Sequence, residues 1–311
     1  MPAFVTHVLF GQQLQYELPP ELKSHIDAHP AAYYWGLQGP DLLFFRDAVL
    51  GRSPLPGYGG VMHREQTGKL LQLMARYIRR RKQEGRRDWP VLASYFMGFL
   101  CHYLLDCQTH PFVYYLQERR KRYRDPKEWH GLHHQIESQI DTVLCKQLGG
   151  GPLCTYGIPR DYRCKEDELA IGRLYRQLLH SLYSIEVEAK DVAKSFDDAR
   201  FLMKFTLNSA LLPLVGGVEA LLGRPNGFSA HIRPAAVEED ILNEHHGLWT
   251  DPSDPDNPHN DSFLELLEQA KVRALEGLPQ WFAALHGGEL PDWSDWGSFD
   301  RGNPNLDESN L

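Results

Sequence analysis

The amino-acid sequence predicts an all-α protein. Apolar residues recur at three- and four-residue spacing along most of the chain, as Leu70, Met74 and Tyr77 illustrate. Alternating runs of β-branched residues are rare, and no Asn-Gly turn joins two such runs. The composition, with 42% hydrophobic and 24% charged residues, is typical of a globular chain with a sizeable core. We therefore expect one multi-helix domain over residues 1–288, followed by an acidic tail over residues 289–311.

Seven helices are expected, each over a stretch whose apolar residues keep the helical spacing. In chain order they are Pro20–Ala28, about Arg64–Gln83, Trp89–Glu118, His130–Gln147, Lys165–Tyr183, Ile185–Leu222 with a break at Pro213, and Asp261–His286. Loops rich in Gly, Pro, Asp and Asn are predicted at Gly51–Gly60, Gly149–Cys164, Asn226–Pro234 and Asp251–His259. Asp261 or Ser262 is expected to cap the last helix, because a side-chain oxygen there accepts hydrogen bonds from free backbone amides.

Charge and cysteine content exclude several functional classes. The chain has 33 Lys and Arg against 41 Asp and Glu, a formal net charge of −8, which argues against a general nucleic-acid coat. Five cysteines without a Cys-x-x-Cys pair do not form a disulfide framework, and they favour a reducing compartment. The first ten residues lack the features of a secretion signal, so we expect a cytoplasmic location.

No stretch reaches the roughly 20 apolar residues that a membrane span needs. The most apolar stretch, residues 201–222, contains charged residues and a proline, and we expect it to be a buried core helix. Basic residues cluster in the ranges Arg76–Arg87 and Arg119–Arg124. Such runs could meet anionic lipid or nucleic-acid phosphate, but they are more often solvated helix faces, which is the interpretation we prefer.

Two histidines and an aspartate recur every four residues in an otherwise apolar helix, at His102, Asp106 and His110. Four residues advance about 6 Å and about 400° along a helix, so the first two side chains project from nearly the same face. Ionisable groups are costly to bury unpaired, and a metal ion bound by imidazole and carboxylate removes that cost. Because Pro111 disfavours helical geometry at His110, we expect that side chain to turn towards a second ion.

A second histidine–carboxylate pair follows on the next predicted helix, at His133 and Glu137. This four-residue spacing lets two side chains converge on one ion. His130 and His134 also lie near Glu137 on a helical wheel, and we prefer His133 because only it gives the His-x-x-x-Glu spacing. One such pair is more often a structural contact, whereas two pairs on two helices favour a metal site.

The order of these motifs resembles that of the zinc-dependent phospholipases C, with the single-strand-specific zinc nucleases as more distant relatives. The family's pattern is an early His, a Pro-Asp, an isolated His, a His-x-x-x-Asp with a following His, and a His-x-x-x-Glu. The corresponding residues here are His7, Asp41, His63, His102, Asp106, His110, His133 and Glu137. The resemblance extends over about the first 145 residues. One departure is the gap between Asp106 and His110, which is slightly shorter than in the secreted enzymes.

The resemblance implies a cluster of zinc ions between helices. The residues that it places on the first ion are Asp41, His63, His102 and Asp106. Those that it places on the second are His110, His133 and Glu137. A third ion would take His7 and a bridging Asp106, and in the family it is completed by the amine of an N-terminal Trp. Here Pro2, exposed by removal of Met1, could supply that amine, so two ions are expected and the third depends on it.

The resemblance also implies hydrolysis of a phosphodiester by a zinc-activated water, with Asp41 orienting or deprotonating that water. The substrate would be a phospholipid or a soluble, headgroup-like ester. Two alternatives stay open, namely a metal-binding structural or interaction module without turnover, and a nuclease of the related zinc family, although no stable nucleic-acid complex is expected. Aromatic residues near Asp41 could bind a quaternary ammonium group but are expected mainly in the core: Tyr33, Tyr34, Trp35, Phe44 and Phe45.

Overall fold

The helical periodicity of the sequence becomes helical structure throughout the described part of the chain. The computed structural model describes residues 4–48, 51–148, 163–206, 208–223, 226–234, 237, 240–293 and 296–300. The β-structure among these residues is one antiparallel pair of two-residue strands, β1 (Trp249–Thr250) and β2 (Pro258–His259). The predicted all-α class is therefore confirmed. Most of the predicted loop over 149–164 lies outside the described residues.

The helices and short 3₁₀ helices (η) follow one another along the described chain. Their bounds are α1 (Phe4–Glu17), α2 (Pro20–Ala28), α3 (Pro30–Gly36), η1 (Gly39–Phe45), α4 (Leu55–Arg64), α5 (Thr67–Gln83), α6 (Trp89–Lys121), η2 (Pro126–Glu128), α7 (Leu132–Leu148), α8 (Lys165–Tyr183), α9 (Ala189–Thr206), η5 (Ser209–Leu211), α10 (Leu212–Leu221), η6 (Ser229–His231) and α11 (Phe263–Leu285). The predicted cap of the last helix is Ser262, which forms a capping box with Glu265.

The sequence does not predict α1, α3 or α4. The first half of α1 is buried on nearly every side, so it lacks the polar face that makes a helical period visible. In α4, three glycines and a proline suggest a loop, and the predicted loop Gly51–Gly60 is wrong from Leu55 onwards. Packing against η1 supplies the stability that this Gly-rich helix lacks by propensity.

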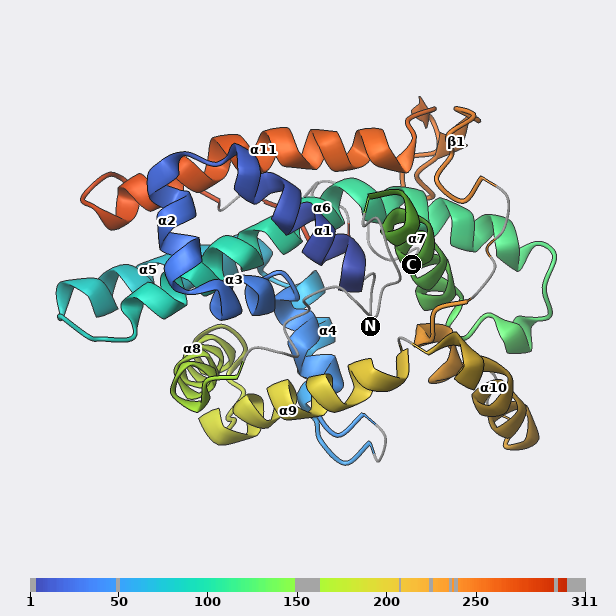
Figure 1. Ribbon diagram of the computed structural model, residues 1–311, viewed down its shortest axis with the longest axis horizontal. Helices are drawn as coiled ribbons and strands as arrows, with labels where there is room; N and C mark the ends of the chain where they lie inside the picture. Colours follow the sequence, from blue (N-terminus) through green and yellow to red (C-terminus); the bar gives the residue numbers. More distant parts are fainter. Residues whose placement is uncertain are drawn as a thin grey trace.

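Helix α6 is the centre of the fold. Figure 1 shows it running along the molecule below α11, and α3 and α5 also pack on it. Its length and mean hydropathy would suffice to cross a membrane, but 94% of its apolar window is buried inside the protein. The ionisable residues of this helix are therefore enclosed by other helices.

Helices α3 and α6 cross at backbone contact through a pair of glycines. A Cβ atom on Gly36 would lie 2.1 Å from the carbonyl oxygen of Tyr95, and one on Gly98 would lie 2.1 Å from that of Tyr33. Larger residues at either position would separate the two helices. The close crossing positions the chain that follows α3, which carries Asp41, against the middle of α6.

The prediction that residues 201–222 form a buried core helix is wrong. The chain bends between α9 and α10, and α10 has no buried residue. The break lies before Leu212, and Pro213 stands in the first turn of α10, where a proline is tolerated, instead of breaking the helix. The large apolar side chains of α10 face outwards, so apolar composition alone was a poor guide to burial here.

The two ends of the described chain are tied to the same region of the molecule. Asp141 of α7 accepts hydrogen bonds from the backbone amides of Val5 and Thr6, at 3.1 and 2.8 Å, which holds the start of α1. Residues 296–300, part of the predicted acidic tail, pack against α6, where Tyr103 donates to the carbonyl oxygen of Gly297. Residues 301–311 lie outside the described chain.

Candidate metal centre

The structure brings together all eight residues that the sequence predicts as metal ligands. They come from five elements, α1, η1, α4, α6 and α7, and all but His133 are buried. Three groups of these side chains could each hold a metal ion, because their ligand atoms lie within 4.8 Å of one another. The groups are His7, His102 and Asp106; Asp41, His63 and His102; and His110, His133 and Glu137.

Asp106 is the residue that joins the groups. Its Oδ2 lies 3.0 Å from Nε2 of His102, and its Oδ1 lies 3.1 Å from Nε2 of His7. The same Oδ1 lies 3.6 Å from Nε2 of His110. The rings of His7 and His102 stack with their centroids 4.2 Å apart. A single carboxylate thus faces three imidazoles from two helices.

Asp41 and His63 close the site from the side of η1 and α4. Nε2 of His63 lies 2.9 Å from Oδ1 of Asp41, and Nε2 of His102 lies 4.0 Å from Oδ2 of the same carboxylate. Gly39, with a positive φ of 49°, makes this approach possible, because a Cβ there would lie 2.2 Å from Cδ2 of His102. The Gly-Pro-Asp sequence is therefore needed for its shape as well as for its carboxylate.

The third group joins α6 to α7. Nε2 of His133 lies 3.1 Å from Oε1 of Glu137, and Nε2 of His110 lies 3.7 Å from the same oxygen. The expected departure from helical geometry at His110 does not occur, because α6 continues through Pro111. His110 nevertheless reaches the second group, since α7 packs beside this turn of α6.

The choice between His133 and His134 follows from the same geometry. His134 also approaches Glu137, with Nδ1 3.4 Å from Oε2, but its ring faces His231 at a centroid distance of 4.4 Å. The group that could hold an ion includes His133 and excludes His134 and His130. The His-x-x-x-Glu spacing therefore selects the residue that meets His110.

Hydrogen bonds to backbone carbonyls orient two of the imidazoles. Nδ1 of His63 donates to the carbonyl oxygen of Gly59 at 2.7 Å, and Nδ1 of His102 donates to that of Leu37 at 3.1 Å. Since a carbonyl can only accept, the hydrogen of a neutral ring is on Nδ1 and the lone pair of Nε2 faces the carboxylates. Two acceptors at about 3 Å repel each other unless a proton or a metal ion lies between them. Carbonyl-oriented imidazoles of this kind are typical of metal-binding histidines.

Several buried polar atoms of the site form no hydrogen bond of acceptable geometry with any described residue. They are Nδ1 of His7, both carboxylate oxygens of Asp41, Nε2 of His102, Oδ2 of Asp106 and Nδ1 of His110. Buried polar groups without partners are rare in folded proteins, because each costs free energy. The residues therefore fit a metal ion, which would satisfy these donor atoms together.

The electrostatics favour the metal-binding ionisation state of both carboxylates and of His102. Burial would raise the pKa of Asp106, but the imidazoles of His102, His110 and His7 hold that pKa well below its ordinary value. Burial would likewise raise the pKa of Glu137, and His133 and His110 hold it well below the usual range. For His102 burial dominates and lowers the pKa, which favours the neutral imidazole. For His63 and His110, burial would lower the pKa, but Asp41 and Asp106 raise it, so a metal ion would displace a proton there. Charged carboxylates beside a neutral imidazole form a donor set for a cation.

Comparison with known protein families shows which family contains this chain. Residues 6–198, more than half of the chain, match the family described as zinc dependent phospholipase C. The chain belongs to this family. No curated protein and no solved structure gives a significant match.

The range matched to the zinc-dependent phospholipase C family contains the ligand candidates and leaves out the later elements of the chain. The family match includes all eight ligand candidates, from His7 to Glu137, and it ends within α9. The elements after it, α10, η6, α11 and residues 296–300, are outside the matched range. The family name indicates zinc as the metal, and three groups of residues in the described chain could hold it.

Sequence reasoning missed Asp300, which lies at the edge of this centre. Its Oδ1 lies 3.2 Å from Nδ1 of His110 and accepts a hydrogen bond of 2.7 Å from the hydroxyl of Tyr114. Burial would raise the pKa of Asp300, but the contact with His110 lowers it to about 2. No spacing in the sequence relates Asp300 to His110. The acidic composition of the tail was the only feature that could have pointed to a carboxylate near the site.

The segment that carries Asp300 is fixed by its neighbours. The backbone amide of Phe299 donates to the carbonyl oxygen of His63 at 2.9 Å, and the Phe299 ring lies 5.0 Å from that of His63. Cys107 contacts the carbonyl oxygen of Ser298 at 3.4 Å. This end of the described chain therefore forms one wall of the metal centre.

A pocket of about 590 Å³ opens onto the centre. Five of the ligand candidates line it, together with Phe44, Arg64, Tyr114 and Asp300. Of the aromatic residues near Asp41, Tyr33, Tyr34, Trp35 and Phe45 are buried in the core, as predicted, and Phe44 alone reaches this pocket. The centre is thus accessible from one side to a small molecule.

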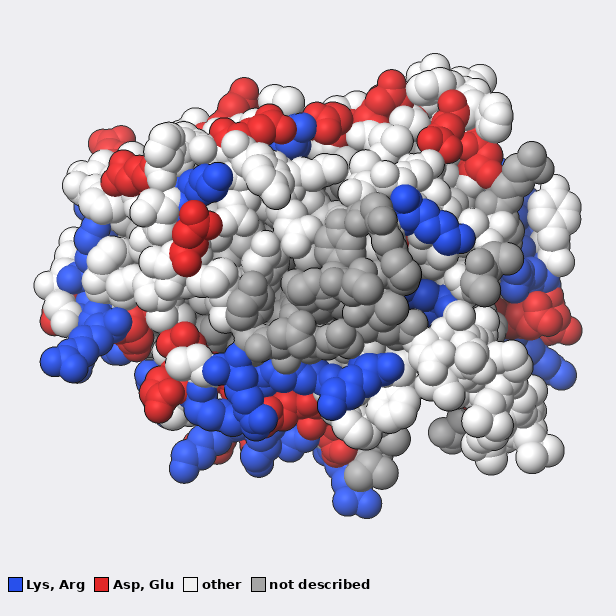
Figure 2. Space-filling view, in the orientation of Figure 1, with Lys and Arg blue, Asp and Glu red and all other residues white. Residues whose placement is uncertain are grey.

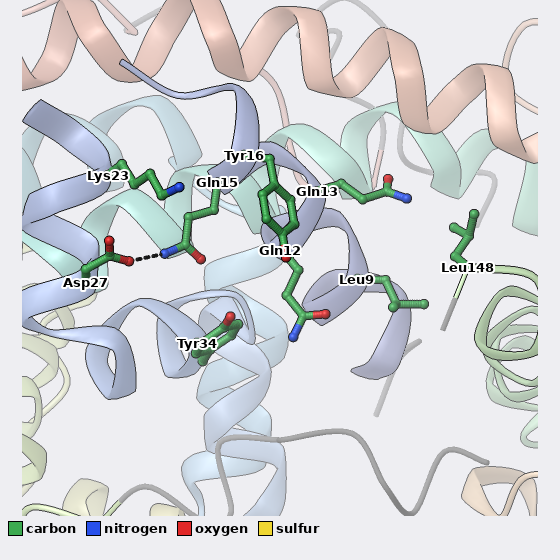
Figure 3. Close-up of a pocket in the computed structure, with 9 residues that line it drawn as sticks. All are labelled: Leu9, Gln12, Gln13, Gln15, Tyr16, Lys23, Asp27, Tyr34 and Leu148. Atoms are coloured by element: carbon green, nitrogen blue, oxygen red, sulfur yellow. Dashed lines mark hydrogen bonds between the residues drawn. The ribbon is translucent and has the colours of Figure 1, made fainter. Parts of the chain in front are cut away.

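A second pocket, of about 450 Å³, lies between α1 and α2 and is lined by Gln12, Gln15 and Tyr16 among others (Figure 3). Its one marked interaction is the hydrogen bond of 2.7 Å from Gln15 to Asp27. None of the ligand candidates lines it. The two cavities are similar in size, but only the pocket at the metal centre is lined by ligand candidates, so we take that pocket as the functional site.

Proposed function

We propose that this protein is a zinc-dependent phosphoesterase that hydrolyses a phosphodiester, with a phospholipid or a soluble headgroup-like ester as substrate. The observation that carries the proposal is a buried set of imidazole and carboxylate donors beneath an open pocket. Bound zinc would polarise a phosphoryl group and lower the pKa of a water molecule. We further propose the cytoplasm as the location, on the basis of the cysteine usage.

The ligand assignment follows from the atoms that are free to bind. His102 belongs to two of the three groups, but its Nδ1 donates to Leu37, so its Nε2 can serve only one ion. We therefore assign one ion to Asp41, His63, His102 and Asp106, and a second to His110, His133 and Glu137. His7 and Oδ1 of Asp106 would hold a third ion. The amine of Pro2, which could complete that third site, lies outside the described residues.

Asp41 is the residue that we propose for proton transfer. It lines the pocket, and its Oδ1 is engaged by His63 at 2.9 Å, which leaves Oδ2 less closely contacted. Oδ2 is therefore the atom that would accept a proton from the attacking water. Phe44 and Tyr114 wall the pocket and limit the access of other water molecules.

Arg64 is expected to bind the substrate's phosphate. It follows His63 at the end of α4, lines the pocket, and its side chain pairs with no carboxylate of the described residues. Replacing it with alanine should raise KM about tenfold, since a hydrogen bond to a charged group contributes about 1.5 kcal/mol. Steady-state kinetics on a chromogenic phosphodiester would measure this. Arg52→Ala, an exposed arginine outside the pocket lining, is the control, and an equal KM in both variants would contradict the role.

Asp300 is expected to position His110 for metal binding. A carboxylate on the second nitrogen of a ligating histidine typically changes metal affinity about 10- to 100-fold. Asp300→Asn should weaken zinc binding in that range, measured by competition with a chromogenic chelator, while the unfolding temperature changes little. Asp292→Asn, on the same segment but exposed, should bind zinc as the wild type does. Unchanged affinity in Asp300→Asn would show that the contact is only structural.

The proposed activity is tested by hydrolysis with and without a chelator. The zinc-loaded protein should hydrolyse p-nitrophenyl phosphodiesters and short-chain phospholipids, and chelation should stop both reactions. Full zinc content without turnover of any ester would favour a structural or interaction module. If the protein hydrolysed single-stranded oligonucleotides and none of the other esters, it would be a nuclease.

A further inference from the structure

Helix α10 has its apolar side facing away from the protein. The exposed large side chains of α10 and of the residue that follows it are Leu214 (66% exposed), Val218 (51%), Leu221 (88%) and Leu222 (70%). They are spaced at i, i+4, i+7 and i+8 and therefore share one face. In most surface helices this face is turned towards the core. We call these four residues the α10 apolar face.

The other side of α10 attaches it to the body of the molecule through small and polar residues. Gly216 and Leu212 face a cavity shared with Gln135 and Ser138 of α7. Glu219 accepts hydrogen bonds from the backbone amides of Phe228 and Ser229, which ties α10 to η6. These contacts fix the orientation of α10, and this orientation turns its apolar face outwards.

This attachment places α10 beside the metal-centre pocket. The ring of His231, the last residue of η6, lies 4.4 Å from that of His134, which lines the pocket. Figure 1 shows α10 projecting from one end of the molecule, and in Figure 2 its surface in view carries no charged side chain. An apolar projection therefore stands next to the opening through which a substrate must enter.

A basic turn adjoins the α10 apolar face. Residues 118–128 comprise the end of α6 and most of the chain that leads to α7. They contain six basic and three acidic residues, in a chain whose net charge is −8, and of the six basic residues Arg120 is buried. The side-chain amide of Asn226, just beyond α10, donates to the carbonyl oxygen of Glu128 at 3.0 Å, which joins the two regions. Tyr123 is 84% exposed on this turn, and Trp129 is exposed directly after it. We call residues 118–128 the basic turn.

We infer that the α10 apolar face and the basic turn together dock on a lipid surface that contains anionic headgroups. Apolar side chains on one helix face, with basic and aromatic residues at its border, are the features of helices that lie in a membrane interface. A second copy of this chain is a poorer fit, because a two-fold contact around α10 would bring the two basic turns towards each other. The inference rests on the proposed function, because the purpose of docking would be to bring phospholipid to the pocket.

Docking also bears on the basic residues at the end of α6, which the sequence analysis assigned to a solvated face. Arg122 and Lys127 are exposed on the basic turn, while Gln117, just before it, and Glu118, its first residue, line the pocket. Contact of the turn with anionic headgroups would therefore bring the lipid phosphates to the level of the pocket. The α10 apolar face would supply most of the affinity, and the basic turn would supply the preference for anionic lipid.

The test is vesicle co-sedimentation of the zinc-loaded, full-length protein. Vesicles of phosphatidylcholine alone and of phosphatidylcholine mixed with phosphatidylserine are compared. The wild type should bind the mixed vesicles more tightly, and Leu214→Glu with Leu221→Glu should weaken binding at least about tenfold, because two apolar side chains no longer enter the interface. Arg122→Glu with Lys127→Glu should remove the preference for the anionic vesicles and retain binding to phosphatidylcholine.

A matched control is available on the same chain. Leu248→Glu with Val272→Glu changes two exposed apolar residues elsewhere, at 75% and 54% exposure, and should bind vesicles as the wild type does. All variants should keep wild-type unfolding temperatures, since no buried residue is changed. Hydrolysis of a water-soluble phosphodiester should also be unchanged in the α10 variant, which separates docking from catalysis.

Three outcomes would overturn the inference. The first is a wild type that binds neither kind of vesicle, and the second is an α10 variant that binds as well as the wild type. The third is a wild-type dimer that the α10 variant converts to monomers, which would show that a second copy covers the helix. Vesicle binding by a protein that hydrolyses no soluble ester would instead contradict the proposed function and leave docking supported.

Discussion

Replacing Asp106 with asparagine is expected to lower kcat/KM for a soluble phosphodiester by about a thousandfold or more and to remove at least one zinc ion per chain. Asp106 faces His7, His102 and His110 within 3.6 Å, so it contacts residues of both proposed ion sites. Asparagine keeps the volume but loses the negative charge that a cation requires. A loss of about 4 kcal/mol in transition-state stabilisation corresponds to this rate change. Steady-state kinetics and metal analysis of the purified variant would measure both effects.

The control for this variant is Asp88→Asn, just before the start of α6. Asp88 is mostly buried and ion-paired with Arg81, whose Nε donates to it at 2.9 Å, but it lies away from the metal centre. Asp88→Asn should therefore keep its zinc and its activity. If Asp106→Asn retained both as well, the proposed role of Asp106 as a shared ligand would be wrong.

Removing the metal is expected to lower the unfolding temperature by about 8 °C or more. A ligand present at about 1,000 times its Kd stabilises the folded state by about 4 kcal/mol, and each kcal/mol corresponds to about 2–4 °C in domains of about 150–250 residues. The effect should be large here because both carboxylate oxygens of Asp41, Nε2 of His102 and Oδ2 of Asp106 are buried without a hydrogen bond of acceptable geometry. Thermal unfolding with and without a chelator would measure it.

Zinc should restore the lost stability, and magnesium should not. Histidine nitrogens suit zinc, whereas magnesium prefers a shell of oxygen ligands. In Asp106→Asn the chelator should shift the unfolding temperature less than in the wild type. Equal unfolding temperatures for the chelated and the zinc-loaded wild type would contradict a metal that stabilises this centre.

The local part of the site could be predicted from the sequence because helical spacing carries it. His102 with Asp106, and His133 with Glu137, are neighbours on a helix face whatever the rest of the fold does. His7, Asp41 and His63 have no local partner, and the resemblance to a family was needed to include them. The structure places Asp41 beside α6 through a backbone approach at Gly39 that no periodicity predicts, and it places His7 and His63 there through the packing of α1 and α4.

The parts that could not be predicted depend on contacts between distant segments. Asp300 meets His110 across 190 residues because Phe299 is held against His63, and such long-range contacts leave no spacing in the sequence. Helix α10 is as apolar as a core helix, yet its position is decided by the bonds of Glu219 to η6. Composition therefore predicted the helix but did not predict that its apolar face is exposed.

The central claim is that this chain holds a zinc cluster, and the most direct test is its zinc content. The protein would be purified with zinc, separated from free metal, and analysed by mass spectrometry of the element against the protein concentration. We predict at least two zinc ions per chain in the wild type, with fewer in both His102→Ala and His133→Ala. Less than one zinc per wild-type chain, or unchanged content in both variants, would contradict the claim.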